Sequence, residues 1–140
     1  MSWTWILRET VLAIHDEQLA EHGGEPGIRS DALLDSSLDR PRNQAHYERQ
    51  SLPGLAAAYA FGLAKTHPFL DGNKRTAAVV SELFLHLHNS ELTATDQQVV
   101  ETIEAVAAGR ISEEELTSFF ETHTRSINDE LESRSRIRPR

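Results

Sequence analysis

Two apolar segments, 52–66 and 74–88, are separated by a short polar junction, and this arrangement constrains the fold more than any other feature. The first segment is rich in alanine, and the second carries valine, leucine and phenylalanine on most of its faces. Both are therefore predicted to be helices buried in the core. Pro68 disfavours the helical conformation at His67, so the first helix has to end there. The charged junction then connects two core helices, and such loops commonly carry binding or catalytic residues.

The remaining sequence also indicates helices. Apolar residues at helical spacing predict a first helix that stops at 22–24. Ser30 is predicted to cap a second helix that reaches about Leu38, with Pro41 closing it and residues 41–50 forming a loop. The glycines and proline of 23–27 predict a turn or short flap.

Two capping boxes mark the last helices. Thr95-x-x-Gln98 precedes a predicted helix over 96–108, which Gly109 ends, and Ser112-x-x-Glu115 starts another. No segment has the pattern of a convincing strand. The predicted fold is all-α, with about six helices around a central apolar helix and one domain over 1–125. The polar tail, 126–140, carries four of the 14 basic residues and could be a frayed helix, a disordered arm or a partner contact.

Composition excludes several classes of function. The 140 residues include no cysteine, which rules out disulfides, thiolate zinc sites and cysteine nucleophiles. The net charge of −8 argues against direct nucleic-acid binding, which depends on Lys and Arg. No apolar run approaches the roughly 20 residues of a membrane span, and the N-terminus lacks the pattern of a secretory signal. We therefore expect a cytoplasmic protein that does not enter a membrane.

Lys74 and Arg75 stand in the first turn of the predicted helix 74–88, where the helix dipole disfavours cations by about 0.3–1 kcal/mol each. Either both side chains point to solvent, or a bound anion makes the two cations favourable at this helix start. Gly72 and Asn73 permit a tight turn that aims N–H groups outward, and the helix start adds its dipole. Lysine supplies a point charge and arginine a bidentate fork for phosphate. The junction predicts a phosphate site, although the GxxxxGK[ST] spacing is absent.

Two further side chains of the junction carry chemistry. Asp71 is suited to Mg²⁺ beside nucleotide phosphates, or it simply caps the helix or pairs with Lys74. His67 is suited to accepting a proton from a hydroxyl at neutral pH, although a lone histidine is more often structural. The six other histidines are less suggestive, and no HExxH zinc motif is present.

The stretch from His67 to Arg75, HPFLDGNKR, closely resembles the signature of the Fic/Doc superfamily. Lys74 is typical of its death-on-curing (Doc) toxins, whereas classical Fic enzymes have glycine there and a longer motif with a second arginine. Segments 19–29 and 107–112 also resemble Doc sequences, and the likeness covers roughly residues 8–125.

The resemblance implies roles for individual residues. His67 would be the general base and Asp71 the Mg²⁺ ligand. Gly72 and Asn73 would form the phosphate-binding turn, while Lys74 and Arg75 would contact phosphate. Phe69 would pack inward and hold the loop. ATP would be the co-substrate.

The resemblance also implies a function. Fic enzymes usually transfer AMP to a protein hydroxyl, whereas Doc toxins transfer the γ-phosphoryl group of ATP, with translation elongation factor Tu as their known target. The leading hypothesis is therefore a kinase-type toxin of a toxin–antitoxin pair that inhibits translation. A Fic-like protein AMP-transferase and a catalytically silent partner-binding domain are the alternatives. The inhibitory motif [ST]xxxE[GN] is not completed at Thr117 or Ser126, so restraint is expected from a cognate antitoxin that folds on binding.

Overall fold

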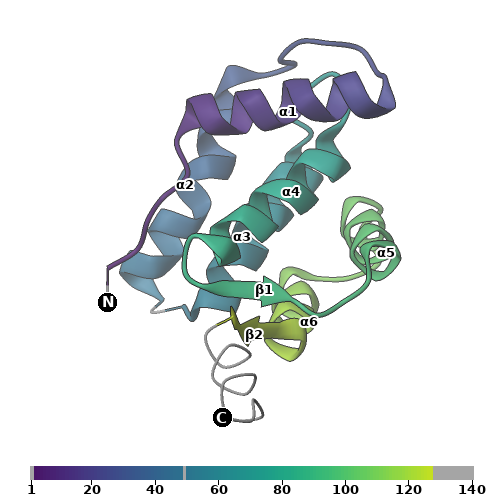
Figure 1. Cartoon of the computed structure of the whole chain (residues 1–140). Helices are drawn as coiled ribbons and strands as arrows, with labels where there is room; N and C mark the ends of the chain where they lie inside the picture. The colour runs from purple at the N-terminus through teal and green to yellow at the C-terminus, as the bar shows by residue number, and fades with distance from the viewer. Residues whose placement is uncertain (1, 49, 128–140) are drawn as a thin grey trace, which may run out of the picture.

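The computed structural model describes residues 2–48 and 50–127, and their fold is mostly helical (Figure 1). Six helices and one two-stranded sheet make up this part of the chain. In chain order the elements are α1 (Arg8–His22), α2 (Asp31–Tyr47), α3 (Leu52–Thr66), α4 (Asn73–His86), β1 (Ser90–Leu92), α5 (Asp96–Ala107), α6 (Glu113–His123) and β2 (Thr124–Ser126). The prediction of an all-α fold with about six helices is confirmed.

Helix α3 is the centre of the core. Nearly all of its residues from Gly54 to Ala64 are buried, and it packs against α2, α4, α5 and α6. Helix α1 packs on α4 and crosses it in Figure 1. The small alanines of α3 allow four helices to approach it closely, because each Cβ methyl group occupies little space between helix axes. The central apolar helix that the sequence predicts is therefore α3.

Helix starts follow the local signals closely. Ser30 caps α2 by accepting a hydrogen bond from the backbone N–H of Leu33. Both capping boxes are formed, at the starts of α5 and α6. These signals are local, because each cap satisfies N–H groups within three residues of itself.

The predicted end of the second helix is wrong, because α2 continues through Pro41 to Tyr47. A proline inside a helix costs about 3 kcal/mol, since it removes a hydrogen bond and crowds the preceding turn. Packing of α2 on α3 and polar contacts with the first residue of α6 oppose this cost. Arg40 forms an ion pair with Glu113, and Gln44 Nε2 donates to Glu113 Oε2 at 2.8 Å. Pro41 itself is buried, so the turn after it is held by tertiary packing.

The absence of strands in the prediction is also corrected. Strand β1 pairs antiparallel with β2, with Ser90 opposite Ser126, and the N–H of Ile127 donates to the carbonyl of Asn89. Three-residue strands are too short to show the alternating pattern that marks a strand in sequence. Residues 128–140, which hold the arginines of the predicted tail, lie outside the described residues, so the tail stays a prediction. No described helix is long and apolar enough to cross a membrane.

Candidate functional site

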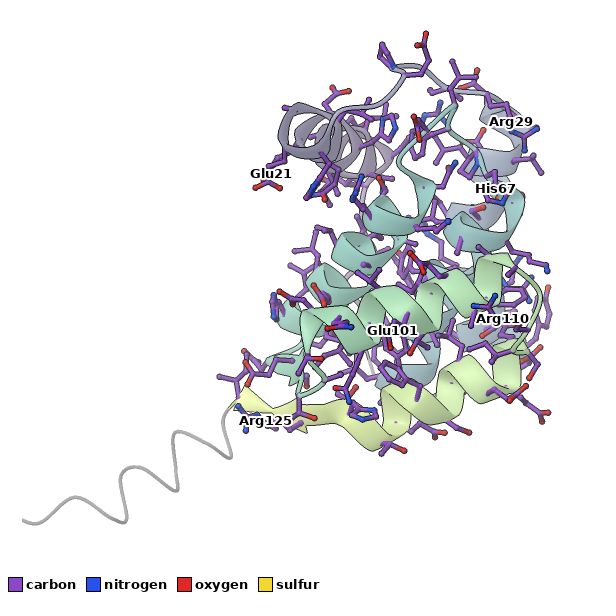
Figure 2. All side chains as sticks on the ribbon, turned by 90° about the vertical axis from the view of Figure 1, so that its right-hand side faces the viewer. Glu21, Arg29, His67, Glu101, Arg110 and Arg125 are labelled. Atoms are coloured by element: carbon purple, nitrogen blue, oxygen red, sulfur yellow. The ribbon has the colours of Figure 1, made fainter. Side chains whose placement is uncertain are left out.

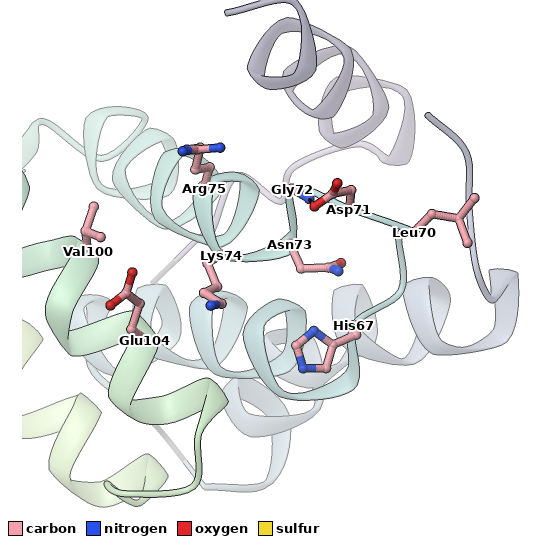
Figure 3. Close-up of a pocket in the computed structure, with 9 residues that line it drawn as sticks. All are labelled: His67, Leu70, Asp71, Gly72, Asn73, Lys74, Arg75, Val100 and Glu104. Atoms are coloured by element: carbon pink, nitrogen blue, oxygen red, sulfur yellow. Dashed lines mark hydrogen bonds between the residues drawn. The ribbon is translucent and has the colours of Figure 1, made fainter. Parts of the chain in front are cut away.

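The junction between α3 and α4 forms one wall of a pocket of about 450 Å³ (Figure 3). All six residues that the sequence proposed for the site line it. The full lining is His67, Leu70, Asp71, Gly72, Asn73, Lys74, Arg75, Val100 and Glu104. The pocket is large enough for a small-molecule ligand, since such sites usually measure 300–1,000 Å³.

The N-terminus of α4 opens into this pocket without a side-chain cap. Gly72 is the N-cap residue and adopts the left-handed conformation, with φ of 75°. The first hydrogen bond inside the helix joins Thr76 N–H to the Gly72 carbonyl. The N–H groups of residues 73–75 therefore have no acceptor within the helix, and they carry the positive end of its dipole. Such a helix start can bind an anion.

The carbonyl groups of the junction are bound on the side of the flap and α2. Arg29 caps the end of α3: its Nε donates to the His67 carbonyl at 2.7 Å and its Nη2 to the Thr66 carbonyl at 2.6 Å. The Pro68 carbonyl accepts from the N–H groups of Arg29 and Ser30. Figure 2 shows Arg29 and His67 at the same end of the molecule. These bonds occupy the carbonyls of residues 66–68, whereas N–H groups without a helical acceptor remain at the start of α4.

Asn73 stabilises the turn through its side chain. Its Oδ1 accepts from the Phe69 N–H at 2.9 Å, and its Nδ2 donates to the Phe69 carbonyl at 3.0 Å. The residue is 8% exposed. The two bonds to the Phe69 backbone hold the amide in place, and the backbone N–H of Asn73, at the start of α4, is available to an anion.

His67 ends α3 in the left-handed conformation, with φ of 51° and ψ of 61°. A non-glycine residue adopts this conformation at some cost, so the surrounding bonds have to hold it there. The bonds from Arg29 to the His67 and Thr66 carbonyls do so. The residue is exposed, and its imidazole points toward the side of the pocket where Lys74 lies (Figure 3). It can therefore reach a hydroxyl group bound in the pocket.

The Asp71 carboxylate is exposed and held by two backbone donors. Oδ1 accepts from the Gly72 N–H at 3.0 Å, and Oδ2 accepts from the Glu25 N–H of the predicted flap at 3.2 Å. A side chain at Gly24 would place its Cβ 3.0 Å from Oδ2, so glycine is needed for this approach. Asp71 neither caps α4 nor forms an ion pair within the described part of the chain. Each oxygen keeps a lone pair for another ligand.

Helix α5 supplies the opposite wall, which the sequence did not predict. Val100 and Glu104 are one helical turn apart and both face the pocket, so they lie across from Lys74 in Figure 3. The pocket thus contains two cations, Lys74 and Arg75, and two carboxylates. Val100 is 44% exposed, and no motif in the sequence indicates this wall.

Sequence reasoning also missed His15 of α1, which lies beneath the junction. It is 3% exposed, its ring stacks on Phe69 with 3.7 Å between ring centroids, and its Nε2–H donates to the Asp71 carbonyl at 2.8 Å. Phe69 is 1% exposed, which confirms that it packs inward. The signal in the sequence was the helical spacing of His15 from Val11, which places both residues on one face of α1. The structure buries that face, together with Gln18.

The chain is similar in sequence to known proteins over the part that contains this pocket wall. The model of the Fic/DOC family matches residues 5–85, a stretch that contains α3, the junction and all but the last residue of α4. "Protein kinase doc" of Escherichia phage P1 is 30% identical over 105 residues, which cover 74% of this chain and 82% of the relative. "Toxin Doc" of Mycolicibacterium smegmatis is 40% identical over 75 residues, 51% of this chain and 57% of the relative. With more than half of its length matched, the chain belongs to the Fic/DOC family.

Proposed function

We propose that this protein is the toxin of a toxin–antitoxin pair and that it transfers the γ-phosphoryl group of ATP to a hydroxyl of a protein. The observation that supports this most directly is the uncapped start of α4, with Lys74 and Arg75, beside His67 and Asp71 in one pocket. The Doc relatives support the toxin role, and the name of the phage protein favours phosphoryl transfer. Translation elongation factor Tu is the proposed target, by the family resemblance.

Phosphate binding would use the backbone and both cations. The N–H groups of residues 73–75 would donate to phosphate oxygens, with Lys74 as a point charge and Arg75 as a bidentate partner. Because Asp71 and Glu104 balance the two cations, the formal charge of the pocket is near zero when His67 is neutral. A polyanion would therefore bind better together with a divalent cation than alone.

Asp71 fits Mg²⁺ shared with a nucleotide. The two backbone donors fix the orientation of its carboxylate, and the oxygens keep free lone pairs. Within the described residues, no group of three or more His, Asp or Glu could hold a metal by itself. Mg²⁺ commonly takes one or two carboxylates and completes its shell with phosphate and water. When bound, it would neutralise charge on the phosphates.

His67 would act as the general base. It would accept the proton of the target hydroxyl while that oxygen bonds to the γ-phosphorus and the bond to the β–γ bridging oxygen breaks, releasing ADP. Lys74 and Arg75 would stabilise the charge of the transferring group. The target and the cognate antitoxin are expected in the cytoplasm, where translation occurs.

AMP transfer is the second candidate, since Pro68–Phe69 and Asp71–Gly72 are shared with Fic enzymes. Labelled ATP separates the two reactions. Target protein labelled from γ-labelled ATP and not from α-labelled ATP is the expected result, and the reverse pattern would establish AMP transfer instead. No label from either, with purified toxin freed of antitoxin, would favour a silent partner-binding domain. Co-expression of the antitoxin, expected to be encoded by the reading frame next to the toxin gene, should suppress toxicity.

The lysine of the turn offers a sharper test. The Lys74→Gly variant has the glycine that classical Fic enzymes carry at this position. If Lys74 orients the triphosphate, this variant should lose γ-phosphoryl transfer. Lys65→Gly, which removes an exposed lysine outside the pocket lining, is the control for lost charge. Phosphorylation at the parent rate by the Lys74→Gly protein would show that this lysine does not decide which phosphate is transferred.

A further inference from the structure

The proposed mechanism assigns no role to the buried imidazole of His15. Its ring lies parallel to the Phe69 ring, with 9° between the planes and 3.7 Å between centroids. Its Nε2 lies 2.8 Å from the carbonyl oxygen of Asp71. A carbonyl oxygen only accepts hydrogen bonds, so Nε2 carries the hydrogen and donates it. One side chain of α1 therefore contacts both the buried aromatic of the junction and the backbone of Asp71.

The surroundings of His15 show how firmly this contact is built. The N-cap Gly72 lies directly above it, since a Cβ there would be 3.6 Å from the imidazole. The same Cβ would lie 3.3 Å from the side chain of Leu19, one turn along α1. Val11, His15 and Gln18 form the buried face of α1, which packs on α4. Helix α1 thus supports the turn at residues 71–72 from below.

We propose that His15 is a positioning residue, which sets the orientation of the Asp71 carboxylate toward Mg²⁺ through the Asp71 backbone carbonyl. This inference rests on the proposed function. The peptide plane after Asp71 contains its carbonyl and the Gly72 N–H, and that N–H donates to Asp71 Oδ1. Fixing the carbonyl therefore fixes the donor that orients the carboxylate. Partners of metal ligands act in this way, and their loss typically costs 10–100-fold in metal affinity or activity.

The predicted effect is selective. In the proposed site, Lys74, Arg75 and the N–H groups of α4 would contact phosphate directly, without the involvement of Asp71. Loss of the His15 hydrogen bond should thus weaken nucleotide binding that depends on Mg²⁺ and leave binding without Mg²⁺ unchanged. A residue with only a general structural role would weaken both.

The test measures binding of a non-hydrolysable ATP analogue by calorimetry, with Mg²⁺ and with a chelator. His15→Phe keeps a flat ring for stacking and removes the donor, and His15→Gln keeps a donor and removes the ring. We expect His15→Phe to lower the affinity about tenfold with Mg²⁺ only, and His15→Gln to retain most of the Mg²⁺ effect. His86→Phe, at an exposed position on α4, is the matched control and should behave as the parent.

Different results would overturn different claims. Equal affinities of parent and His15→Phe in Mg²⁺, or equal losses with and without Mg²⁺, would overturn the positioning role alone. If His15→Phe does not fold, a folded His15→Gln that has lost the Mg²⁺ effect would overturn it as well. A parent protein that binds the analogue in neither condition would overturn the proposed function and, with it, this inference.

Discussion

The start of α4 allows a prediction in which two measurements must change in opposite directions. Lys74 and Arg75 are exposed, they occupy the first turn of an uncapped helix, and neither forms an ion pair within the described residues. Without nucleotide, each cation opposes the helix dipole by about 0.3–1 kcal/mol. Lys74→Ala and Arg75→Ala should therefore raise the melting temperature of the free protein by about 1–4 °C.

With nucleotide bound, the two cations are expected to be favourable, so their removal should weaken binding. A charge-assisted hydrogen bond to phosphate is worth about 1.5–3 kcal/mol, so each alanine variant should bind ATP about 10- to 150-fold more weakly. Thermal melts and calorimetry on the same preparations give both quantities. Higher stability in the free protein together with weaker binding is the pattern that an anion site requires.

Glu9→Ala provides a matched control of opposite sign. Glu9 is exposed in the first turn of α1, another helix without a side-chain cap. The helix dipole stabilises its negative charge there. This variant should melt at a lower temperature and bind ATP as the parent does. Unchanged ATP affinity in both Lys74→Ala and Arg75→Ala would refute the phosphate assignment, because the cations would then be solvated residues without a ligand.

Three further predictions concern a proton acceptor, a partly buried carboxyl group and a buried hydroxyl. His67→Ala should lower transfer by about 10²–10⁴-fold while ATP affinity and melting temperature stay near those of the parent; undiminished toxicity of a well-expressed variant would contradict the role. Burial, and then the charge of Asp96, raise the pKa of Glu82 above its ordinary value. The folded state therefore loses stability as pH rises through this raised pKa, and Glu82→Gln should raise the melting temperature at about pH 7 and change it little at about pH 4; equal effects at both values would exclude the linkage. Tyr59→Phe removes the hydroxyl that accepts the buried Ile6 N–H at 3.1 Å, so urea denaturation should show a loss of about 1–3 kcal/mol; Tyr47→Phe, at an exposed position, should show none.

The parts of the fold that the sequence predicted are those governed by local rules. Pro68 ends α3 because it restricts the residue before it, and the caps of α2, α5 and α6 act within one turn of the chain. Pro41 failed as a signal because Glu113, far away in sequence, anchors the helix beyond it. The cost of a proline inside a helix can be estimated from the sequence, but the tertiary contacts that oppose it cannot.

The same division applies to the candidate site. Residues 67–75 are continuous in sequence, so their joint appearance in one pocket follows from a single turn between two helices. Glu104, Arg29 and His15 come from three other segments. Their proximity depends on how α5, the flap and α1 pack around α3 and α4, which residue spacing does not encode. The roles of all these residues stay predictions until the variants above are measured.

Arg29 has an electrostatic consequence that extends beyond the bonds it forms. Helices α3 and α4 meet at the junction end to start, so the negative pole of one macrodipole lies close to the positive pole of the other. Without a cation at the end of α3, the fields of the two poles would partly cancel at the position of an approaching anion. The Arg29 guanidinium covers the last carbonyls of α3 and neutralises the negative pole. The positive pole of α4 is then less opposed at the pocket, so Arg29, which does not line the pocket, would make it more favourable for an anion.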